Sequence, residues 1–236
     1  GQNVNSYISE DGLRFPELLA QTAALSEKVR IRFVTSHPKD FSERLAEVIK
    51  EHGNICPLVH LPLQSGSDRI LKLMNRGYTV HSYLEKLEKA VKIAPSLRFS
   101  TDIIVGFPGE SEADFLKTAE IFQQTEYETA FIFNYSPRSG ANAYKLPDDI
   151  PMSEKKSRLA HLLSIQEAVT EKRYSSIIGE TVQVLVESPS KKDASQLSGR
   201  TEYNRVVNFK AALELGDMAT LRITGVKKNT LIGESL

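Results

Sequence analysis

The chain has 236 residues, with 30 Lys and Arg against 30 Asp and Glu, and 40% of its residues are hydrophobic. This composition is typical of a globular protein and excludes collagen-like, disordered and disulfide-stapled chains. The single cysteine, Cys56, can form neither an internal disulfide nor the thiolate cage of a zinc ion or an iron–sulfur cluster.

Short β-prone runs alternate with helical periodicity over the first two thirds of the chain. Because strands and helices alternate at this spacing, we expect βαβ units and a parallel sheet, with ligands at the polar exits of the strands. Strands are predicted at 31–36, 58–63, 99–106 and 129–135, and helices at 41–52, 67–75, 80–94 and 112–124.

The pattern changes after Tyr144. Residues 146–151 contain two prolines and predict a linker, and 153–175 have the periodicity of a long amphipathic helix. The last 60 or so residues predict a small β-barrel, because several short alternating runs are separated by glycines. These runs are 181–187, 199–201, 205–209, 216–224 and 230–234.

The charge balance and the cysteine count also bear on the cellular compartment and the partners of the protein. A net charge of zero argues against a surface covered with nucleic-acid-binding cations, and is compatible with a local basic patch. A lone thiol predicts a reducing compartment. The sequence has no run of about 18 apolar residues and does not open with a basic-then-apolar leader. We therefore expect a cytoplasmic protein with no membrane partner.

Three strand-associated segments are candidate ligand loops. Pro62–Ser67 precedes a helix, where backbone amides suit a ribose or carboxylate, although an ordinary loop is the alternative. Asp102–Glu110 offers a flat apolar floor for a planar ring, and Glu110 equally suits a helix-capping role. Tyr135–Arg138 brings a guanidinium that suits a carboxylate or phosphate, or else an ordinary surface position.

Other chemistry finds little support in the sequence. Gly1–Tyr7 carries three amides that suit a small polar ligand, with a solvated turn as the favoured alternative. The five histidines lack metal-ligand spacing, and His60 is expected to be a hydrogen-bonded core residue. No nucleophile elbow is present. No residue of this chain is therefore assigned as a catalytic residue or as a metal ligand.

The predicted barrel carries cations beside aromatic side chains. Arg200, Arg205 and Phe209 lie in the alternating runs, and small barrels with such residues commonly bind RNA. Nearby carboxylates nearly cancel the charge, so a solvated barrel face is the competing interpretation.

Taken together, these segments resemble one family, the radical-SAM methylthiotransferases. Gly199–Thr201 with its flanks is similar to the TRAM domain that ends those enzymes. Gly1–Tyr7 is most similar to the members that add a methylthio group to carbon 2 of N(6)-isopentenyladenosine beside the tRNA anticodon, at tRNA position 37. The segments that occur in family order are Gly1–Tyr7, Ser36–Pro38, His60–Ser67, Leu73–Thr79, Thr101–Glu110 and Tyr135–Arg138.

The resemblance implies an α/β fold in three parts. These are a partial radical-SAM (βα) barrel at 1–145, a linker and connecting helix at 146–175, and a small all-β TRAM barrel at 176–236. It implies S-adenosylmethionine as a ligand and the tRNA anticodon stem-loop as the partner. The S-adenosylmethionine-binding positions implied are Gln2, Asn3, Gln64, Ser65, Ile104, Val105, Gly106, Tyr135 and Arg138. Arg200, Arg205 and Phe209 would help to hold the RNA.

The family pattern also differs from this chain in one respect. The full-length enzymes hold two 4Fe–4S clusters, and the cysteines that bind them are absent here. The chain therefore resembles the C-terminal part of such an enzyme and is expected to be inactive alone. The alternatives are a ribosomal-protein methylthiotransferase of the same family and a non-catalytic RNA-binding module.

Overall fold

The computed structural model describes residues 3–34, 36–191, 193 and 195–236. It divides into two compact units, Gly1–Glu167 and Ala168–Leu236. The long helix α6 (Met152–Ser176) runs from the first unit into the second. The predicted three-part division stays a prediction. No helix in the described part of the chain is long and apolar enough to cross a membrane.

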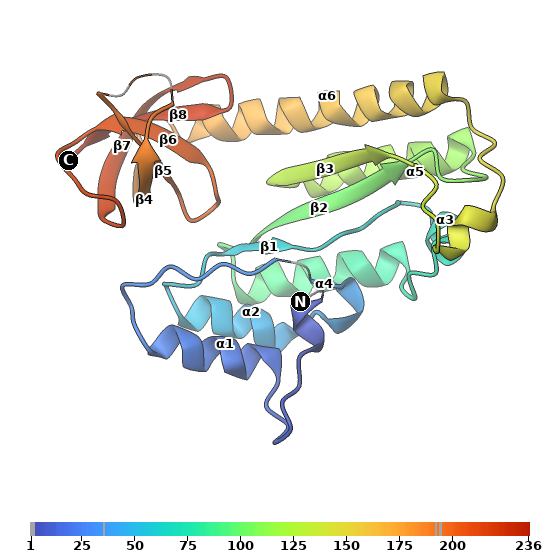
Figure 1. The fold of residues 1–236 in the computed structure, drawn as a ribbon, viewed down its shortest axis with the longest axis horizontal. Coiled ribbons are helices and arrows are strands. Elements are labelled where there is room, and N and C mark those ends of the chain that lie inside the picture. The colour runs from blue at the N-terminus through green and yellow to red at the C-terminus, as the bar shows by residue number, and fades with distance from the viewer. Residues whose placement is uncertain (1–2, 35, 192, 194) are drawn as a thin grey trace. The chain divides into compact units, whose positions relative to one another are not determined.

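A three-stranded parallel sheet lies at the centre of the first unit (Figure 1). Its strands, in spatial order, are β1 (Leu58–His60), β2 (Arg98–Val105) and β3 (Thr129–Asn134). The α/β fold with a parallel sheet that the sequence predicts is therefore confirmed. The helices are α1 (Phe15–Ala24), α2 (Glu43–Glu51), α3 (Asp68–Leu73), α4 (Val80–Ile93), α5 (Glu112–Thr125) and α6, with 3-10 turns η1 (Val4–Ser6), η2 (Pro38–Asp40) and η3 (Asn142–Lys145).

Local signals explain where several helices begin. Ser42 caps α2, and its hydroxyl accepts a hydrogen bond from the Leu45 amide. Ser111 and Asp114 form a reciprocal capping box at the start of α5. Helix α1 has no counterpart among the predicted elements, although Pro16 in its first turn and the spacing of buried Leu19 and Ala23 are helix signals.

The two faces of the sheet differ in burial. Val59, Ile103 and Val105 are fully buried in the main apolar cluster with the helices. On the other face, Phe131 and Phe133 of β3 are about half exposed, at 51% and 52%. Because successive strand residues point to opposite faces, this alternation leaves the second face available for a pocket.

Two of the predicted strands differ from the structure. The 31–36 strand is wrong, because among its described residues only Ile31 pairs, through an isolated parallel bridge to Ile55. Phe33 is instead held by an edge-to-face contact with Phe15, with ring centroids 5.2 Å apart. The 58–63 strand ends at His60, because Pro62 has no N–H to donate to the ladder.

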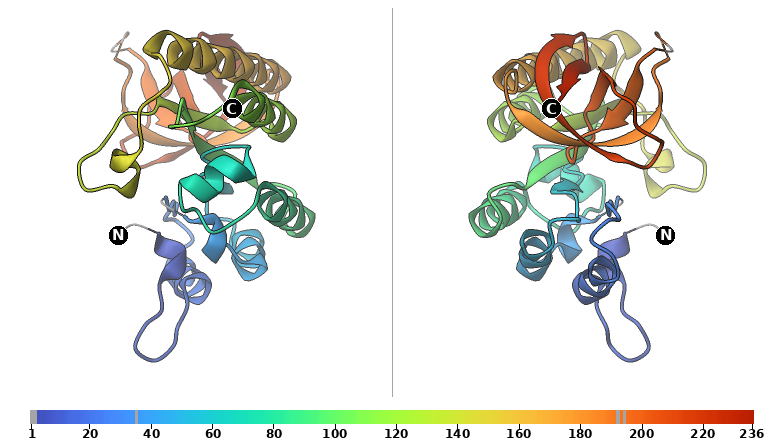
Figure 2. Two further views of the ribbon diagram at one scale, coloured as in Figure 1. Left: turned by 90° about the vertical axis from the view of Figure 1, so that its right-hand side faces the viewer. Right: turned by 90° about the vertical axis from the view of Figure 1, so that its left-hand side faces the viewer.

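The second unit is a closed five-stranded barrel (Figure 2). Its strand order is β4-β5-β6-β8-β7. Its core includes Val184, Val207, Phe209, Leu221 and Leu231. The predicted small β-barrel is confirmed. Its strands are β4 (Thr181–Pro189), β5 (Leu197–Arg200), β6 (Val206–Lys210), β7 (Met218–Lys227) and β8 (Thr230–Ser235).

Candidate functional site

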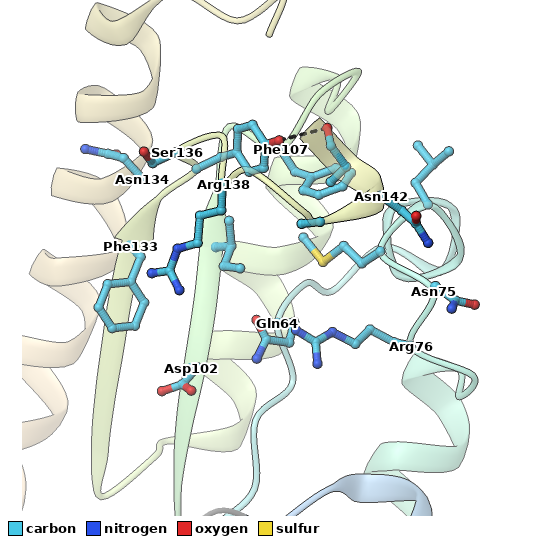
Figure 3. Close-up of a pocket in the computed structure, with 16 residues that line it drawn as sticks. Gln64, Asn75, Arg76, Asp102, Phe107, Phe133, Asn134, Ser136, Arg138 and Asn142 are labelled. Carbon is cyan, nitrogen blue, oxygen red and sulfur yellow. Dashed lines mark hydrogen bonds between the residues drawn. The ribbon is translucent and has the colours of Figure 1, made fainter. Parts of the chain in front are cut away.

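A pocket of about 600 Å³ lies in the first unit, at the carboxyl ends of β2 and β3 (Figure 3). Ligands of α/β sheets commonly bind at this edge, and the volume lies within the range of small-molecule sites. The polar and charged side chains of its lining are Gln64, Asn75, Arg76, Asp102, Asn134, Ser136, Arg138 and Asn142. The apolar and aromatic ones are Leu73, Met74, Ile104, Phe107, Phe133, Tyr135, Ala141 and Ala143.

Gln64 reaches this pocket through an irregularity in the sheet. The Leu63 amide donates to Thr101 Oγ1 at 2.9 Å, and the ladder resumes where Gln64 pairs with Ile103. Gln64 has a left-handed backbone, with φ of 70°. Its side chain points into the pocket, the residue is only 6% exposed, and Oε1 has no hydrogen-bond partner among the described residues. A buried, unpaired acceptor of this kind is costly unless a ligand satisfies it.

Three charged residues surround Gln64. Arg76 reaches toward Gln64 from the α3–α4 loop, and Arg138 points into the pocket from the exit of β3 (Figure 3). Asp102 of β2 also lines the cavity. The sequence analysis included Asp102 in the candidate loop Asp102–Glu110 but assigned neither Arg76 nor Asp102 as a ligand-binding position. Asp102 lies on the same face of β2 as Ile104, two residues away. Two guanidinium groups and a carboxylate can bind a ligand that carries both a carboxylate and a cation.

His60 lies beside Asp102 on the same face of the sheet. Its Nε2 is 3.4 Å from Asp102 Oδ2, and its Nδ1 is 3.1 Å from Ser100 Oγ. Both ring nitrogens therefore have partners, as expected for a hydrogen-bonded histidine.

The apolar side of the pocket is built from two aromatic rings and an aliphatic chain. Phe107 and Tyr135 pack edge-to-face with ring centroids 5.1 Å apart, and Ile104 contacts the same cluster. The Tyr135 hydroxyl donates to the Ala143 carbonyl at 3.0 Å (dashed line in Figure 3). Such a surface suits a planar ring.

The β2 exit turns sharply at Gly106, which has φ of 70°. The Gly106 amide donates to Glu110 Oε2 at 2.7 Å, and Arg158 Nη1 donates to the same oxygen at 2.6 Å. Burial raises the pKa of Glu110, while these two hydrogen bonds act in the opposite direction. Glu110 thus closes the turn that carries Phe107 into the pocket.

Besides Gly106, four of the positions implied by the resemblance are not in the lining. Gln2 lies outside the described residues. Asn3 joins the N-terminal segment to the 37–40 turn, because its Nδ2 donates to Asp40 Oδ2 at 2.7 Å and its Oδ1 accepts from the His37 amide at 3.1 Å. Ser65 is fully buried, and its hydroxyl accepts from the Ser67 amide. Val105 is buried in the core.

The three residues predicted to bind RNA differ in their surroundings. Arg200 is partly exposed, pairs with Glu187 at 3.0 Å, and borders a cavity of about 540 Å³ on the barrel together with Lys191 and Lys227. Arg205 is 9% exposed, and its guanidinium carbon lies 5.3 and 5.6 Å from the ring centroids of Tyr174 and Tyr203. Phe209 is 2% exposed, in the barrel core.

The residues present do not fit an iron–sulfur cluster. The one cysteine, Cys56, is buried. Across residues 3–34, 36–191, 193 and 195–236, no group of three or more His, Cys, Asp or Glu side chains could hold a metal ion.

Comparison with known proteins identifies both units. Residues 7–122 match the radical SAM superfamily, and residues 176–236 match the TRAM domain. Among solved structures, coproporphyrinogen III oxidase (HemN) from Escherichia coli aligns with a TM-score of 0.46 and 14% identity, covering 79% of this chain and 45% of that one.

Curated relatives match along the whole chain, and all three described here are named tRNA-2-methylthio-N(6)-dimethylallyladenosine synthase. The protein from Chlorobium chlorochromatii (strain CaD3) is 45% identical, covering 100% of this chain and 53% of its own length. That from Chlorobium phaeobacteroides (strain BS1) is 46% identical, covering 99% and 53%. That from Moorella thermoacetica (strain ATCC 39073 / JCM 9320) is 43% identical, also covering 99% and 53%.

The chain therefore spans about half the length of the curated relatives that it matches. Within that half, the radical SAM segment contains β1, β2 and part of the pocket lining, whereas β3 lies beyond it, and the TRAM segment contains the barrel. The two matched segments and the identity along the whole chain lead to one conclusion: the chain belongs to the radical-SAM methylthiotransferase family.

Proposed function

We propose that this chain is part of a cytoplasmic tRNA methylthiotransferase, which adds a methylthio group to carbon 2 of N(6)-isopentenyladenosine at tRNA position 37. Its first unit binds S-adenosylmethionine, and its barrel contacts the anticodon stem-loop. In the full-length enzyme, S-adenosylmethionine and two 4Fe–4S clusters supply the radical chemistry, and this chain alone is inactive. The relatives' shared name supports the reaction, and the pocket supports the ligand.

One observation carries the ligand assignment: Gln64 Oε1 is buried and unpaired where Arg76, Asp102 and Arg138 converge. S-adenosylmethionine has an amino group and a ribose that can donate to Gln64. It also has a carboxylate that can bind either arginine, and ammonium and sulfonium cations that can lie beside Asp102. Its adenine is a planar ring that suits the wall formed by Ile104, Phe107 and Tyr135.

The other proposed positions support the lining residues and do not themselves line the pocket. Gly106 turns the chain so that Phe107 lines the pocket, and Val105 anchors the end of β2 in the core. Ser65 fixes the backbone beside Gln64 through its bond from the Ser67 amide. Gln2 and Asn3 stay proposals on the resemblance alone.

The barrel's proposed role depends on its exposed face. We assign Arg200 to RNA phosphates, because it borders a surface cavity with two lysines. Arg205 and Phe209 are buried, so they support this face by packing against the tyrosines and the core.

Equilibrium dialysis with radiolabelled S-adenosylmethionine tests the pocket. The chain should bind the ligand saturably, and Gln64→Ala and Arg138→Ala should each raise Kd by about tenfold, equivalent to about 1.4 kcal/mol. Gln21→Ala, which removes an exposed amide on α1, is the matched control and should leave Kd unchanged. Equal affinities in all four proteins would contradict the assignment.

The nucleoside profile of tRNA from cells that lack the gene tests the reaction. Methylthio-isopentenyladenosine should disappear and isopentenyladenosine should accumulate. An unchanged profile would reject the tRNA assignment, and loss of the modification from a ribosomal protein instead would support that alternative. RNA binding without any S-adenosylmethionine binding would favour a non-catalytic RNA-binding module.

A further inference from the structure

We propose that Lys155 and Arg158, on the first turns of α6, are positioning residues for the pocket. They hold the two strand exits, 106–110 and 135–138, that supply its aromatic wall and Arg138. The identity of the ligand depends on the proposed function, whereas the positioning of the wall does not.

Arg158 fixes the first strand exit. The residue is 3% exposed, and its Nη1 donates to Glu110 Oε2 at 2.6 Å and to the Glu110 carbonyl at 3.0 Å. The same Glu110 oxygen accepts the Gly106 amide. Arg158 is therefore bound to both the side chain and the backbone of the residue that closes the turn around Phe107.

Lys155 fixes the second strand exit and also contacts the first. The residue is 1% exposed, and its Nζ pairs with Asp148 at 2.5 Å. Nζ lies 3.4 Å from the Tyr135 carbonyl and 5.3 Å from the centroid of the Tyr135 ring. Its aliphatic stem covers Gly106, where an added Cβ would come within 2.3 Å of Lys155 Cγ. One side chain thus contacts both segments.

The two segments meet inside the pocket. Phe107 and Tyr135 pack edge-to-face at 5.1 Å, so a shift in either strand exit displaces the surface on which a planar ring would rest. Binding sites need their lining held to about 0.5 Å by surrounding residues. Lys155 and Arg158 of helix α6 supply that support, and neither is among the residues that line the pocket.

Stabilisation of the fold is, by itself, a poor explanation for the burial of these two charges. Removing an ammonium or guanidinium group from water is unfavourable, and apolar replacement of both members of a buried ion pair is often neutral to stability, whereas loss of one member is destabilising. We expect these charges to control the geometry of the two strand exits instead. A methionine of similar length would keep the packing of each stem, remove the polar contacts, and leave Asp148 or Glu110 without its cation.

The test compares Lys155→Met and Arg158→Met with Lys156→Met, which removes an exposed cation from the same turn of α6. Amide hydrogen exchange without ligand is measured on peptides covering 106–110 and 135–138, with peptides from α4 as an internal reference. S-adenosylmethionine Kd is measured in parallel. Arg158→Lys keeps one charge-assisted donor toward Glu110 and serves as the conservative rescue.

We expect exchange at the two strand exits to rise at least tenfold in Lys155→Met and Arg158→Met and to stay unchanged in α4 and in Lys156→Met. Kd should rise about tenfold in the same two variants, with Arg158→Lys intermediate. Unchanged exchange at the strand exits would overturn the inference. Global acceleration, including α4, would also overturn it, because the residues would then be general stabilisers. If the wild-type chain binds no S-adenosylmethionine, the proposed ligand fails while the exchange data still decide the positioning role.

Discussion

The aliphatic stem of Lys155 occupies the space where Gly106 would carry a side chain. A Cβ at Gly106 would lie 2.3 Å from Lys155 Cγ and 2.9 Å from Cδ, and the backbone there is left-handed, with φ of 70°. Two independent constraints, one conformational and one steric, therefore require glycine at the exit of β2.

Gly106→Ala should lower the free energy of unfolding by about 3 kcal/mol, the sum of about 1 kcal/mol of backbone strain and the cost of overpacking. Gly109→Ala is the matched control, because Gly109 is also left-handed but has nothing within 4 Å of an added Cβ. It should cost only about 1 kcal/mol. Urea unfolding measures both, and in a Lys155→Ala background the cost of Gly106→Ala should fall toward that of Gly109→Ala. Equal costs at the two glycines would contradict the steric argument.

The acid stability of the first unit should depend on Asp114. Burial acts to raise the pKa of this carboxyl, but hydrogen bonds from Arg69, Ser111 and Ser67 outweigh it and hold the pKa well below the ordinary value of 3.8. Because the folded state keeps Asp114 ionised more strongly than the unfolded state, its stabilisation is full above about pH 4. It is lost as the pH falls below that value.

Asp114→Asn should therefore flatten the decline of stability below pH 4, by up to about 1.4 kcal/mol per pH unit. At neutral pH the same variant should be less stable than the wild-type chain, because the charge-assisted bonds are weakened. Urea unfolding at a series of pH values from 2 to 7 measures both effects. Glu120→Gln, on the exposed part of the same helix, should leave the acid profile as it is. An unchanged slope in Asp114→Asn would count against this account.

The alternation of residues along β2 explains which of its implied ligand positions reaches the pocket. Ile104 lines it, whereas its neighbour Val105 is turned into the core. Gln64 lies beyond the end of β1 and has a left-handed backbone, so its place in the pocket and the burial of Ser65 have another cause. Adjacent residues of a strand face opposite sides, so Ile104 and Val105 could contribute only one side chain. This rule was available from the sequence and would also have identified Asp102, two positions before Ile104.

Other features depended on contacts that are distant in sequence. Arg76 reaches the pocket from a loop between two helices, and no strand pattern marks it. The burial of Lys155 and Arg158 was equally unforeseen, because cations early in an amphipathic helix are normally exposed. The run 31–36 has the local pattern of a strand, yet among its described residues only Ile31 forms a bridge. β-Propensity reflects packing with neighbours that local patterning does not reveal.

In the barrel, Gly199 should be intolerant of any side chain. An added Cβ would lie 2.3 Å from the Leu185 carbonyl oxygen and 2.5 Å from Val184 Cγ1, so β4 would have to move. Gly199→Ala should cost about 3 kcal/mol, whereas Gly225→Ala, with nothing within 4 Å of the new Cβ, should stay within about 0.5 kcal/mol. Hydrogen exchange should be faster across 181–235 in Gly199→Ala and unchanged in β2. Normal exchange in the barrel would show that β4 accommodates the methyl group.

Substitutions of the two barrel arginines should change different properties: the stability of the barrel for Arg205, and the binding of RNA for Arg200. Arg205 is buried and makes cation–π contacts with two tyrosine rings, so Arg205→Ala should lower barrel stability by about 2 kcal/mol through lost packing and cation–π contacts. Arg200 forms a partly exposed ion pair with Glu187, and Arg200→Ala should cost less than about 1 kcal/mol.

Binding of an anticodon stem-loop over a range of salt concentrations completes the comparison between the two arginines. If Arg200 neutralises a phosphate, Arg200→Ala should weaken binding and reduce the slope of log K against log salt by about one. Arg205→Lys keeps the charge and should preserve that slope even where it lowers stability. Identical slopes for the wild-type chain and Arg200→Ala would exclude a phosphate contact at Arg200. The same loss of slope in Arg205→Lys would mean that the buried arginine acts by shaping the surface around Arg200.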